Sequence, residues 1–359
     1  MNSRSSLSAR FSRSASRPRH GGRVRMLAAV TAVAGLALTG CVAGEDSSGA
    51  SAVEAADGGT LTLDFATYNP LSLIIKDQCW REDSLEGVTV EWVQSAGSNK
   101  ANENLRSGAI DVGSTAGSAA LLNRANGSPI KAIDVFSQPE WSALVVAADS
   151  DITSVADLAG KSVAATTGTD PYFFLAQALE EAGLGLSDVT VEQLQHADGR
   201  AALENGSVDA WAGLDPIMAG AEENGARLAY RNVDFNTYGL LAANESFLKD
   251  NPEQAQAVVN AYEKARAWAA ENPEETAKIL AGVAGLDLAV ATTVISERSN
   301  LDVDPAPGEA QRRVLARIAP TLVETGDVAG QDQVDAALAE LLDDSYVRNA
   351  DPAAVGGSK

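Results

Sequence analysis

Short apolar runs alternate with longer amphipathic stretches along the body of the chain. Runs of strand length cover residues 61–66, 88–93, 110–113, 130–136 and 143–147. A helical stretch that ends near Ser107 separates the second run from the third. This alternation is typical of βαβ units that build mostly parallel sheets. We therefore expect an α/β fold in this part of the chain.

The same alternation continues beyond residue 160. Further strands are predicted at residues 162–165, 189–194, 208–211 and 227–230. Between the strands at residues 162–165 and 189–194 we expect a helix. Asp170 is expected to cap this helix, and Pro171 to lie in its first turn. Residues 237–243 are expected to return the chain to the first set of strands. The last third is predicted to be helical, with helix starts at Asn251-Pro252 and Asn272-Pro273.

Two segments about a hundred residues apart repeat one pattern. Leu105 to Asp111 (LRSGAID) and Leu203 to Asp209 (LENGSVD) each end a helix at a glycine and enter a strand. Glycine suits the left-handed position just past a helix end. Such joints occur in any α/β protein, but their repetition favours two lobes of similar topology. We predict that lobe 1 comprises residues 59–153 and 237–350, and that lobe 2 comprises residues 154–236.

The first forty residues predict export. Seven arginines precede an apolar run from Met26 to Leu38, which is shorter than the ~20 residues of a membrane-spanning helix. A basic segment followed by a short apolar run is typical of a secretory signal. The alternative is an ordinary buried helix with a chance cysteine. The run ends in Leu38-Thr39-Gly40-Cys41, which resembles the bacterial lipobox, whose cysteine is diacylated.

The N-terminal region therefore predicts a lipid-anchored protein on the extracytoplasmic face of the cell membrane. We expect a lipoprotein signal peptide over residues 1–40, with lipidation of Cys41 as the membrane anchor. Residues 41–58 are small, polar and acidic, and they are expected to form a flexible tether.

Charge and composition exclude several classes of protein. Loss of the seven signal arginines takes the formal charge from −22 to −29, which argues against nucleic acid as a partner. Acylation of Cys41 would leave Cys79, the other cysteine, without a partner, so we expect no intramolecular disulfide. His196 is the one histidine after the signal, and it is expected at a helix start near the surface. With no HExxH or CxxC motif in the sequence, we expect neither a metal site nor a cofactor.

Four segments occur in the order of a known family. They are Gly108–Ala120 (GAIDVGSTAGSAA), Ser154–Ala164 (SVADLAGKSVA), Thr166–Gly183 (TTGTDPYFFLAQALEEAG) and Gly206–Pro216 (GSVDAWAGLDP). Together they resemble the type II periplasmic solute-binding proteins of ABC transporters, most of all the aliphatic sulfonate, taurine and nitrate binding group. The resemblance covers residues ~60 to ~300 and is strengthened by the lipobox.

The resemblance implies a two-lobed α/β fold with mostly parallel mixed sheets, a hinge and a helical C-terminal part. It implies that a small-molecule ligand is held between the lobes and that the partners are ABC permease subunits. It also implies that the protein is a monomer and that it is not an enzyme. Two positions depart from the family pattern. Leu214 replaces an aromatic residue before the Asp-Pro pair, and Thr115-Ala116-Gly117 replaces Thr-Gly-Asp. Both positions face the ligand in the family, so the identity of the ligand stays open.

Candidate ligand contacts lie where strands end and helices begin, because open α/β sheets bind ligands there. Hydroxyl groups and free backbone N–H groups at helix starts suit an oxyanion such as a sulfonate. Serine and threonine also cap helices at such places, and the sequence does not separate the two roles. The predicted ligand-binding residues are Tyr68, Asn69, Ser114, Thr115, Trp141, Thr167, Gly168, Thr169, Trp211 and Asp215.

Three of these candidates have a second interpretation. Trp141 and Trp211 could form cleft walls against an organic tail or pack in the core. Asp215 could cap a helix that begins at Pro216, or it could attract an amine and so favour a zwitterion such as taurine.

The leading prediction is an aliphatic sulfonate or taurine as ligand, with nitrate and a pyrimidine vitamin precursor as alternatives. An enzyme or a sensor lipoprotein on the same fold is the rival class. The segment GSTAG at residues 113–117 resembles a nucleophile elbow, but its central residue is Thr115 and nothing in the sequence brings His196 to it.

Overall fold

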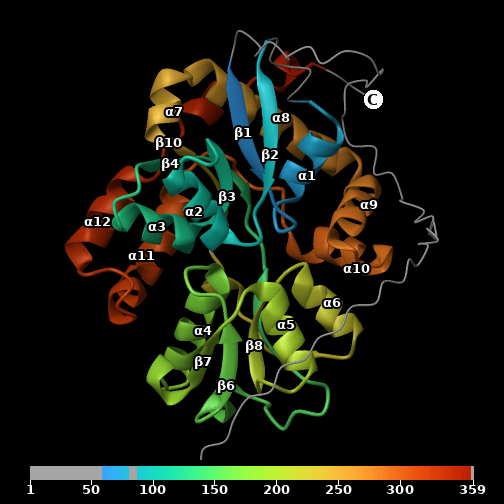
Figure 1. The fold of residues 1–359 in the computed structure, drawn as a ribbon, viewed down its shortest axis with the longest axis vertical. Coiled ribbons are helices and arrows are strands. Elements are labelled where there is room, and N and C mark those ends of the chain that lie inside the picture. Colours follow the sequence, from blue (N-terminus) through green and yellow to red (C-terminus); the bar gives the residue numbers. More distant parts are fainter. Residues whose placement is uncertain (1–58, 81–86, 357–359) are drawn as a thin grey trace, which may run out of the picture. The chain divides into compact units, whose positions relative to one another are not determined.

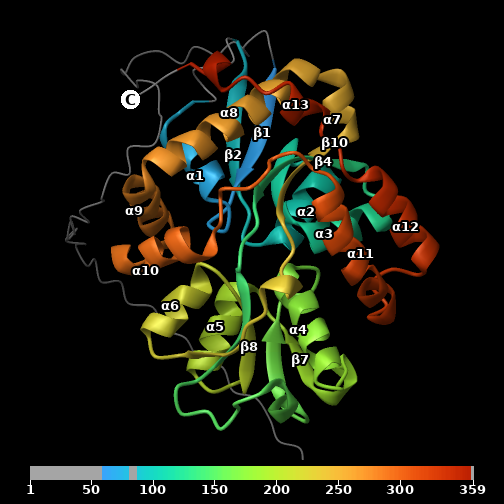
Figure 2. The same cartoon turned by 180° about the vertical axis from the view of Figure 1, so that it is seen from behind.

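The computed structural model describes residues 59–80 and 87–356. These residues contain two five-stranded mixed sheets, each with helices packed on it (Figures 1 and 2). The strand order is β2-β1-β3-β10-β4 in the first sheet and β7-β6-β8-β5-β9 in the second. The predicted α/β fold with two mixed sheets and a helical C-terminal part is confirmed. The predicted signal peptide, Cys41 and the tether lie outside the described residues.

The first sheet is the centre of lobe 1. Its parallel strands are β1 (Thr60–Phe65), β2 (Thr89–Gln94) and β3 (Val112–Ala116). β10 (Gly239–Asn244) runs antiparallel between β3 and β4 (Ile130–Ser137). The chain therefore returns to lobe 1 as the sequence predicted, and it does so in the interior of the sheet.

The second sheet is the centre of lobe 2. β6 (Ser162–Ala165) is parallel to β7 (Thr190–Gln193) and β8 (Ala210–Leu214). β5 (Ser142–Val146) is antiparallel to β8 and to β9 (Arg227–Tyr230). The predicted lobe boundary at residue 153 is therefore wrong for β5. Its apolar residues pair within the second sheet, so the chain crosses between the sheets before Ser142.

Helices follow the strands in both lobes. Up to residue 223 they are α1 (Pro70–Asp77), α2 (Ser98–Ser107), α3 (Gly117–Ala125), α4 (Asp170–Glu181), α5 (His196–Glu204) and α6 (Ile217–Glu223). The C-terminal part contains α7 (Glu245–Asp250), α8 (Pro252–Glu271), α9 (Pro273–Ala284), α10 (Leu288–Thr293), a π-helical turn (Val294–Arg298), α11 (Glu309–Glu324), α12 (Gln331–Glu340) and α13 (Ser345–Arg348). Short 3-10 turns cover Val155–Leu158, Leu186–Asp188, Val233–Phe235 and Pro352–Ala354.

Apolar packing joins the C-terminal helices to both lobes. Ile74 of α1 and Val258 of α8 are buried in one cluster against the first sheet. Leu315 of α11 belongs to the same buried cluster as Phe173 of α4 in lobe 2. On the other side, Ala291 of α10 clusters with Ala219 of α6. The C-terminal helices thus hold the two lobes against each other at two places.

Two further findings concern the described part of the chain. No helix there has the length and apolarity to cross a bilayer. Cys79 is disulfide-bonded, so the expectation of no intramolecular disulfide is wrong, and its bonding partner lies outside the described residues.

Candidate ligand cleft between the lobes

Helix starts from the two lobes face each other. α2 and α3 begin after β2 and β3 of the first sheet, and α4, α5 and α6 begin after β6, β7 and β8 of the second. Ser118 in the first turn of α3 donates a hydrogen bond to Asp170 at the start of α4. Gly168, just before α4, lies against Leu122 of α3. The carboxyl ends of the parallel strands therefore meet across one cleft, as expected for ligand binding by α/β sheets.

A small cavity lies at one end of this cleft. Its lining includes Tyr68, Trp141, Asp215, Arg298 and Ser299, from both lobes. The rings of Tyr68 and Trp141 meet edge to face, with centroids 6.0 Å apart. The cavity has a volume of about 10 Å³, and a single water needs ~10–15 Å³. This cavity is therefore too small for an organic ligand.

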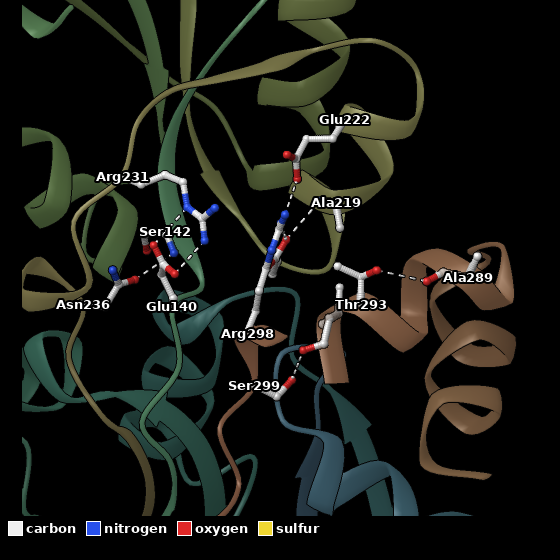
Figure 3. A network of polar contacts seen from close by, with 12 residues as sticks. Glu140, Ser142, Ala219, Glu222, Arg231, Asn236, Ala289, Thr293, Arg298 and Ser299 are labelled. Atoms are coloured by element: carbon white, nitrogen blue, oxygen red, sulfur yellow. Dashed lines mark hydrogen bonds and ion pairs between the residues drawn. The ribbon is translucent and has the colours of Figure 1, made fainter. Parts of the chain in front are cut away.

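Asp215 lines this cavity and also caps a helix. Its Oδ1 accepts a hydrogen bond from the Ala219 backbone N–H at 3.0 Å. The Nη1 of Arg298 lies 3.3 Å from Asp215 Oδ2, and its Nη2 lies 2.7 Å from Glu222 Oε2 (Figure 3). Burial raises the pKa of Asp215 to about 6, although Arg298 opposes the shift. The Asp215 carboxylate therefore bonds to the first turn of α6 and pairs with Arg298, and its role in attracting an amine stays a prediction.

Arg298 is a cavity residue that sequence reasoning missed. It ends the π-helical turn that follows α10, and it carries no motif. Its two ion pairs reach Asp215 before α6 and Glu222 within α6. Arg298 therefore ties the C-terminal part of lobe 1 to lobe 2.

The two segments that cross between the lobes are joined to each other. Arg231 donates two hydrogen bonds to Glu140, from Nε to Oε1 at 3.0 Å and from Nη2 to Oε2 at 2.7 Å (Figure 3). Nearby, the side-chain oxygen of Asn236 accepts a hydrogen bond from the backbone N–H of Ser142 at 2.8 Å. These bonds join the two crossing segments to each other.

Three predicted contacts form a buried network beneath the cleft. Ser114 donates from its backbone N–H and its hydroxyl to Asp64 Oδ1, both at 2.8 Å. Asn69 donates to the Ser114 hydroxyl at 2.8 Å, and the Tyr68 hydroxyl donates to the Ser114 carbonyl at 2.9 Å. Asn69, Ser114 and Thr115 are completely buried. None of the three lines the cavity, and Ser114 holds the Tyr68 hydroxyl through its carbonyl.

Asp170 does not cap α4, contrary to the sequence prediction. Thr169 takes the N-cap position, and its hydroxyl donates to the Thr166 carbonyl at 2.6 Å. The Asp170 carboxylate instead accepts bonds from Ser118, Trp141 and Thr237. Trp141 Nε1 and the Thr237 N–H each lie 2.8 Å from its Oδ2. Asp170 therefore links lobe 2 to lobe 1 and to both crossing segments.

The remaining candidates divide between the cleft and the core. The Thr167 hydroxyl is buried and has no partner among the described residues, next to Gly168, whose φ is 74°. Trp211 is completely buried in the core of lobe 2, and a Cβ on Gly199 would lie 2.8 Å from its ring. Trp211 therefore packs in the core and lies away from the cavity lining, whereas Thr167 stays a ligand candidate.

His196 is a second residue whose place the sequence did not reveal. It begins α5 as predicted, but only 1% of its surface is exposed, so the expectation of a surface position is wrong. Gly97, before the start of α2 in lobe 1, lies against its ring. Local patterning carries no signal for a contact between positions that are so far apart in the chain.

Comparison with known proteins agrees with this architecture. Residues 84–276 match the model of the NMT1/THI5-like family. A protein of Escherichia coli (strain K12) that is assigned as an aliphatic sulfonates-binding protein is 30% identical over 223 residues, which are 61% of this chain and 70% of the relative. A Bacillus subtilis (strain 168) protein with the same assignment is 30% identical over 242 residues, which are 66% and 73% of the two chains.

Solved structures share the fold. The alkanesulfonate-binding protein SsuA from Xanthomonas axonopodis pv. citri, bound to MOPS, superposes with a TM-score of 0.71 at 24% identity, over 80% of this chain and 99% of that one. The desulfurization enzyme DSZB superposes with a TM-score of 0.59 at 15% identity, over 81% and 98% of the two chains. The fold therefore carries both binding proteins and an enzyme.

Proposed function

The chain belongs to the NMT1/THI5-like family, and we propose that it is the substrate-binding protein of an ABC importer, with an aliphatic sulfonate or taurine as its ligand. One observation carries the proposal. The chain is 30% identical to the Escherichia coli protein that is assigned to aliphatic sulfonates, over 70% of that protein's length. The family resemblance seen in the sequence agrees with it.

The geometry of the cleft supports capture by closure of the lobes. A ligand shifts a two-state equilibrium only if it binds one state more tightly, so it must contact both lobes. The starts of α2 and α5 have no capping hydrogen bond from an N-cap side chain. Their N–H groups lie at the positive ends of helix dipoles and suit a sulfonate group. Tyr68 and Trp141 supply an apolar wall at the other end of the cleft.

A thermal-shift screen of the purified protein tests the ligand class. Alkanesulfonates, taurine, nitrate and pyrimidines would each be added at a hundredfold excess over a trial Kd. A ligand that binds only the folded state stabilises it by about 2.7 kcal/mol under these conditions. We expect the sulfonates to raise the melting temperature and the other compounds to leave it unchanged. If only nitrate or only a pyrimidine stabilised the protein, that compound would replace the sulfonates as the proposed ligand class.

An enzyme on this fold would consume its ligand. Because DSZB shares the architecture, each stabilising compound would also be incubated with the protein and followed by mass spectrometry. A binding protein leaves the compound unchanged over hours. Catalytic loss of the compound would overturn the assignment as a binding protein.

The proposed export, lipid anchor and permease partners complete the function. The mass of the N-terminal peptide from membrane-bound protein tests the anchor. We expect a diacylated Cys41 and partition of the protein into detergent. An unmodified Cys41 would refute the anchor.

A further inference from the structure

Asp170 is a buried carboxylate that receives four hydrogen bonds from three separate segments. Its Oδ2 accepts from Trp141 Nε1 and from the Thr237 backbone N–H, both at 2.8 Å. Its Oδ1 accepts from the Thr237 hydroxyl at 2.6 Å and from the Ser118 hydroxyl. The residue is almost completely buried. Burial raises the pKa of Asp170, and the four bonds oppose the rise because they favour the charged form.

These bonds fix the place of the carboxylate. Ser118 lies in the first turn of α3, Trp141 directly precedes β5, and Thr237 lies just before β10. The Thr237 hydroxyl also accepts a bond from the Ser118 backbone N–H at 3.1 Å, so two partners of the carboxylate are joined to each other. An indole N–H can only donate, and in the described part of the chain its acceptor is Asp170. Asp170 therefore sets the orientation of the Trp141 indole.

Trp141 is one of the two rings of the apolar wall. Its ring centroid lies 6.0 Å from that of Tyr68 and 6.3 Å from that of Phe136. The Ser114 carbonyl anchors the polar tip of Tyr68 at 2.9 Å. Asp170 anchors the indole N–H of Trp141 in the same manner. Buried tyrosine and tryptophan residues need such a partner, and its position decides how the ring is presented.

We propose that Asp170 is a positioning residue for ligand binding, which sets the Trp141 indole against the organic chain of the ligand and so determines the preference for chain length. The inference rests on the proposed function, which gives the ligand both a sulfonate and an organic chain. The two oxygens of Asp170 already accept four bonds, so the residue acts on the ligand through Trp141. Loss of the carboxylate should weaken the contacts to the chain and spare those of the sulfonate with the starts of α2 and α5.

Two sulfonates that differ only in chain length test this role by titration calorimetry on the purified protein. Methanesulfonate and butanesulfonate share the charged group, and butanesulfonate adds three methylene groups that the apolar wall can bury. We expect the wild-type protein to bind butanesulfonate at least tenfold more tightly. In Asp170→Ala this ratio should fall to threefold or less, while the affinity for methanesulfonate stays within threefold of the wild type.

A carboxylate elsewhere in lobe 2 supplies the matched control. Asp157 is exposed in the turn Val155–Leu158, and its Oδ2 also accepts four hydrogen bonds, from Thr153 and Ser154. It does not line the cavity that contains Trp141. Asp157→Ala should therefore keep the wild-type ratio.

Two further variants examine the bond itself. Trp141→Phe keeps a ring in the wall and loses the indole N–H, so it tests the bond even if Asp170→Ala does not fold. Its ratio should also fall to threefold or less, and adding Asp170→Ala should lower it by less than a further twofold, since the bond is already absent. Asp170→Asn should keep the wild-type ratio, because its amide oxygen accepts from the two N–H groups while its NH₂ donates to the two hydroxyls.

The outcomes separate this role from the proposed function. An unchanged ratio in Asp170→Ala or in Trp141→Phe would overturn the role of Asp170 and leave the proposed function standing. Equal losses of affinity for both sulfonates would contradict it as well, because they would show that Asp170 only holds the lobes together. A reduced ratio in Asp170→Asn would show that charge rather than position matters. If neither sulfonate binds the wild type, the role is refuted, and taurine in the thermal-shift screen decides whether the proposed function falls with it.

Discussion

Replacing Gly97 by alanine tests whether the lobes meet at this point when a ligand is held. The backbone at Gly97 is extended, with φ at 173°, so alanine adopts it without strain. The new Cβ would lie 2.9 Å from His196 Nε2 and 3.0 Å from its Cδ2. Overpacking of this kind costs about 1–3 kcal/mol. Because the His196 ring belongs to the other lobe, opening the cleft removes the clash.

The cost of the His196 contact therefore falls on the closed state alone. The Cβ would also lie 2.9 Å from Asn99 Oδ1 of the same lobe, and rotation of that side chain relieves this contact in both states. Since 1.4 kcal/mol is a factor of ten in affinity, taurine binding should weaken roughly five- to hundredfold in Gly97→Ala. The melting temperature without ligand should change little. Titration calorimetry measures the affinity, and X-ray scattering with and without ligand measures closure.

A glycine in open space supplies the control. A Cβ on Gly282, exposed in α9, would meet no atom within 4 Å, so Gly282→Ala should keep the wild-type affinity. An unchanged affinity in Gly97→Ala would refute the reasoning, because it would show that the ligand-bound lobes do not approach each other at Gly97.

Three further predictions concern stability and pH. Burial raises the pKa values of Asp64 and Asp215 from 3.8 to about 6, so the folded state binds more protons than the unfolded state between pH 4 and 6. Their contribution to stability is complete below pH 4 and is lost as the pH rises through 6; urea unfolding should show this slope, and Asp64→Asn should flatten it. Arg298→Met should lower the free energy of unfolding by about 3 kcal/mol, because it leaves buried Asp215 without its cation; a loss below ~0.5 kcal/mol in urea titrations would contradict this. Trp211→Phe should cost about 1–3 kcal/mol in the same assay while ligand affinity stays within twofold, and a larger loss of affinity would place Trp211 at the ligand.

Strands were predictable where apolar residues are contiguous. The segments Ser162–Ala165 and Arg227–Tyr230 form strands with the predicted bounds. The third strand was displaced from residues 110–113 to 112–116, because Ser114 and Thr115 are polar and yet completely buried. Asp64, fifty residues earlier in the chain, supplies the hydrogen bonds that make this burial possible. A local pattern does not contain that information.

The candidate site shows the same limit more sharply. Helix starts could be located from proline and glycine positions, and this gave Tyr68 and Asp215 at the cavity. Arg298 and His196 depend on contacts between distant segments, such as His196 with Gly97. Trp211 was ambiguous in the sequence because a buried strand and a cleft wall both favour an aromatic residue. Only the pairing of β8 with β5 and β6 decides between them.

The interior position of β10 constrains how the protein is made. Synthesis proceeds from the N-terminus, yet the gap between β3 and β4 is filled by residues 239–244. Until those residues emerge from the ribosome, β3 and β4 each present an unpaired edge that invites aggregation. The second sheet has all its strands by residue 230 and can assemble first. During folding from the N-terminus, lobe 2 would therefore be complete before lobe 1, although lobe 1 is begun first. A chaperone is most needed while β3 and β4 wait for β10.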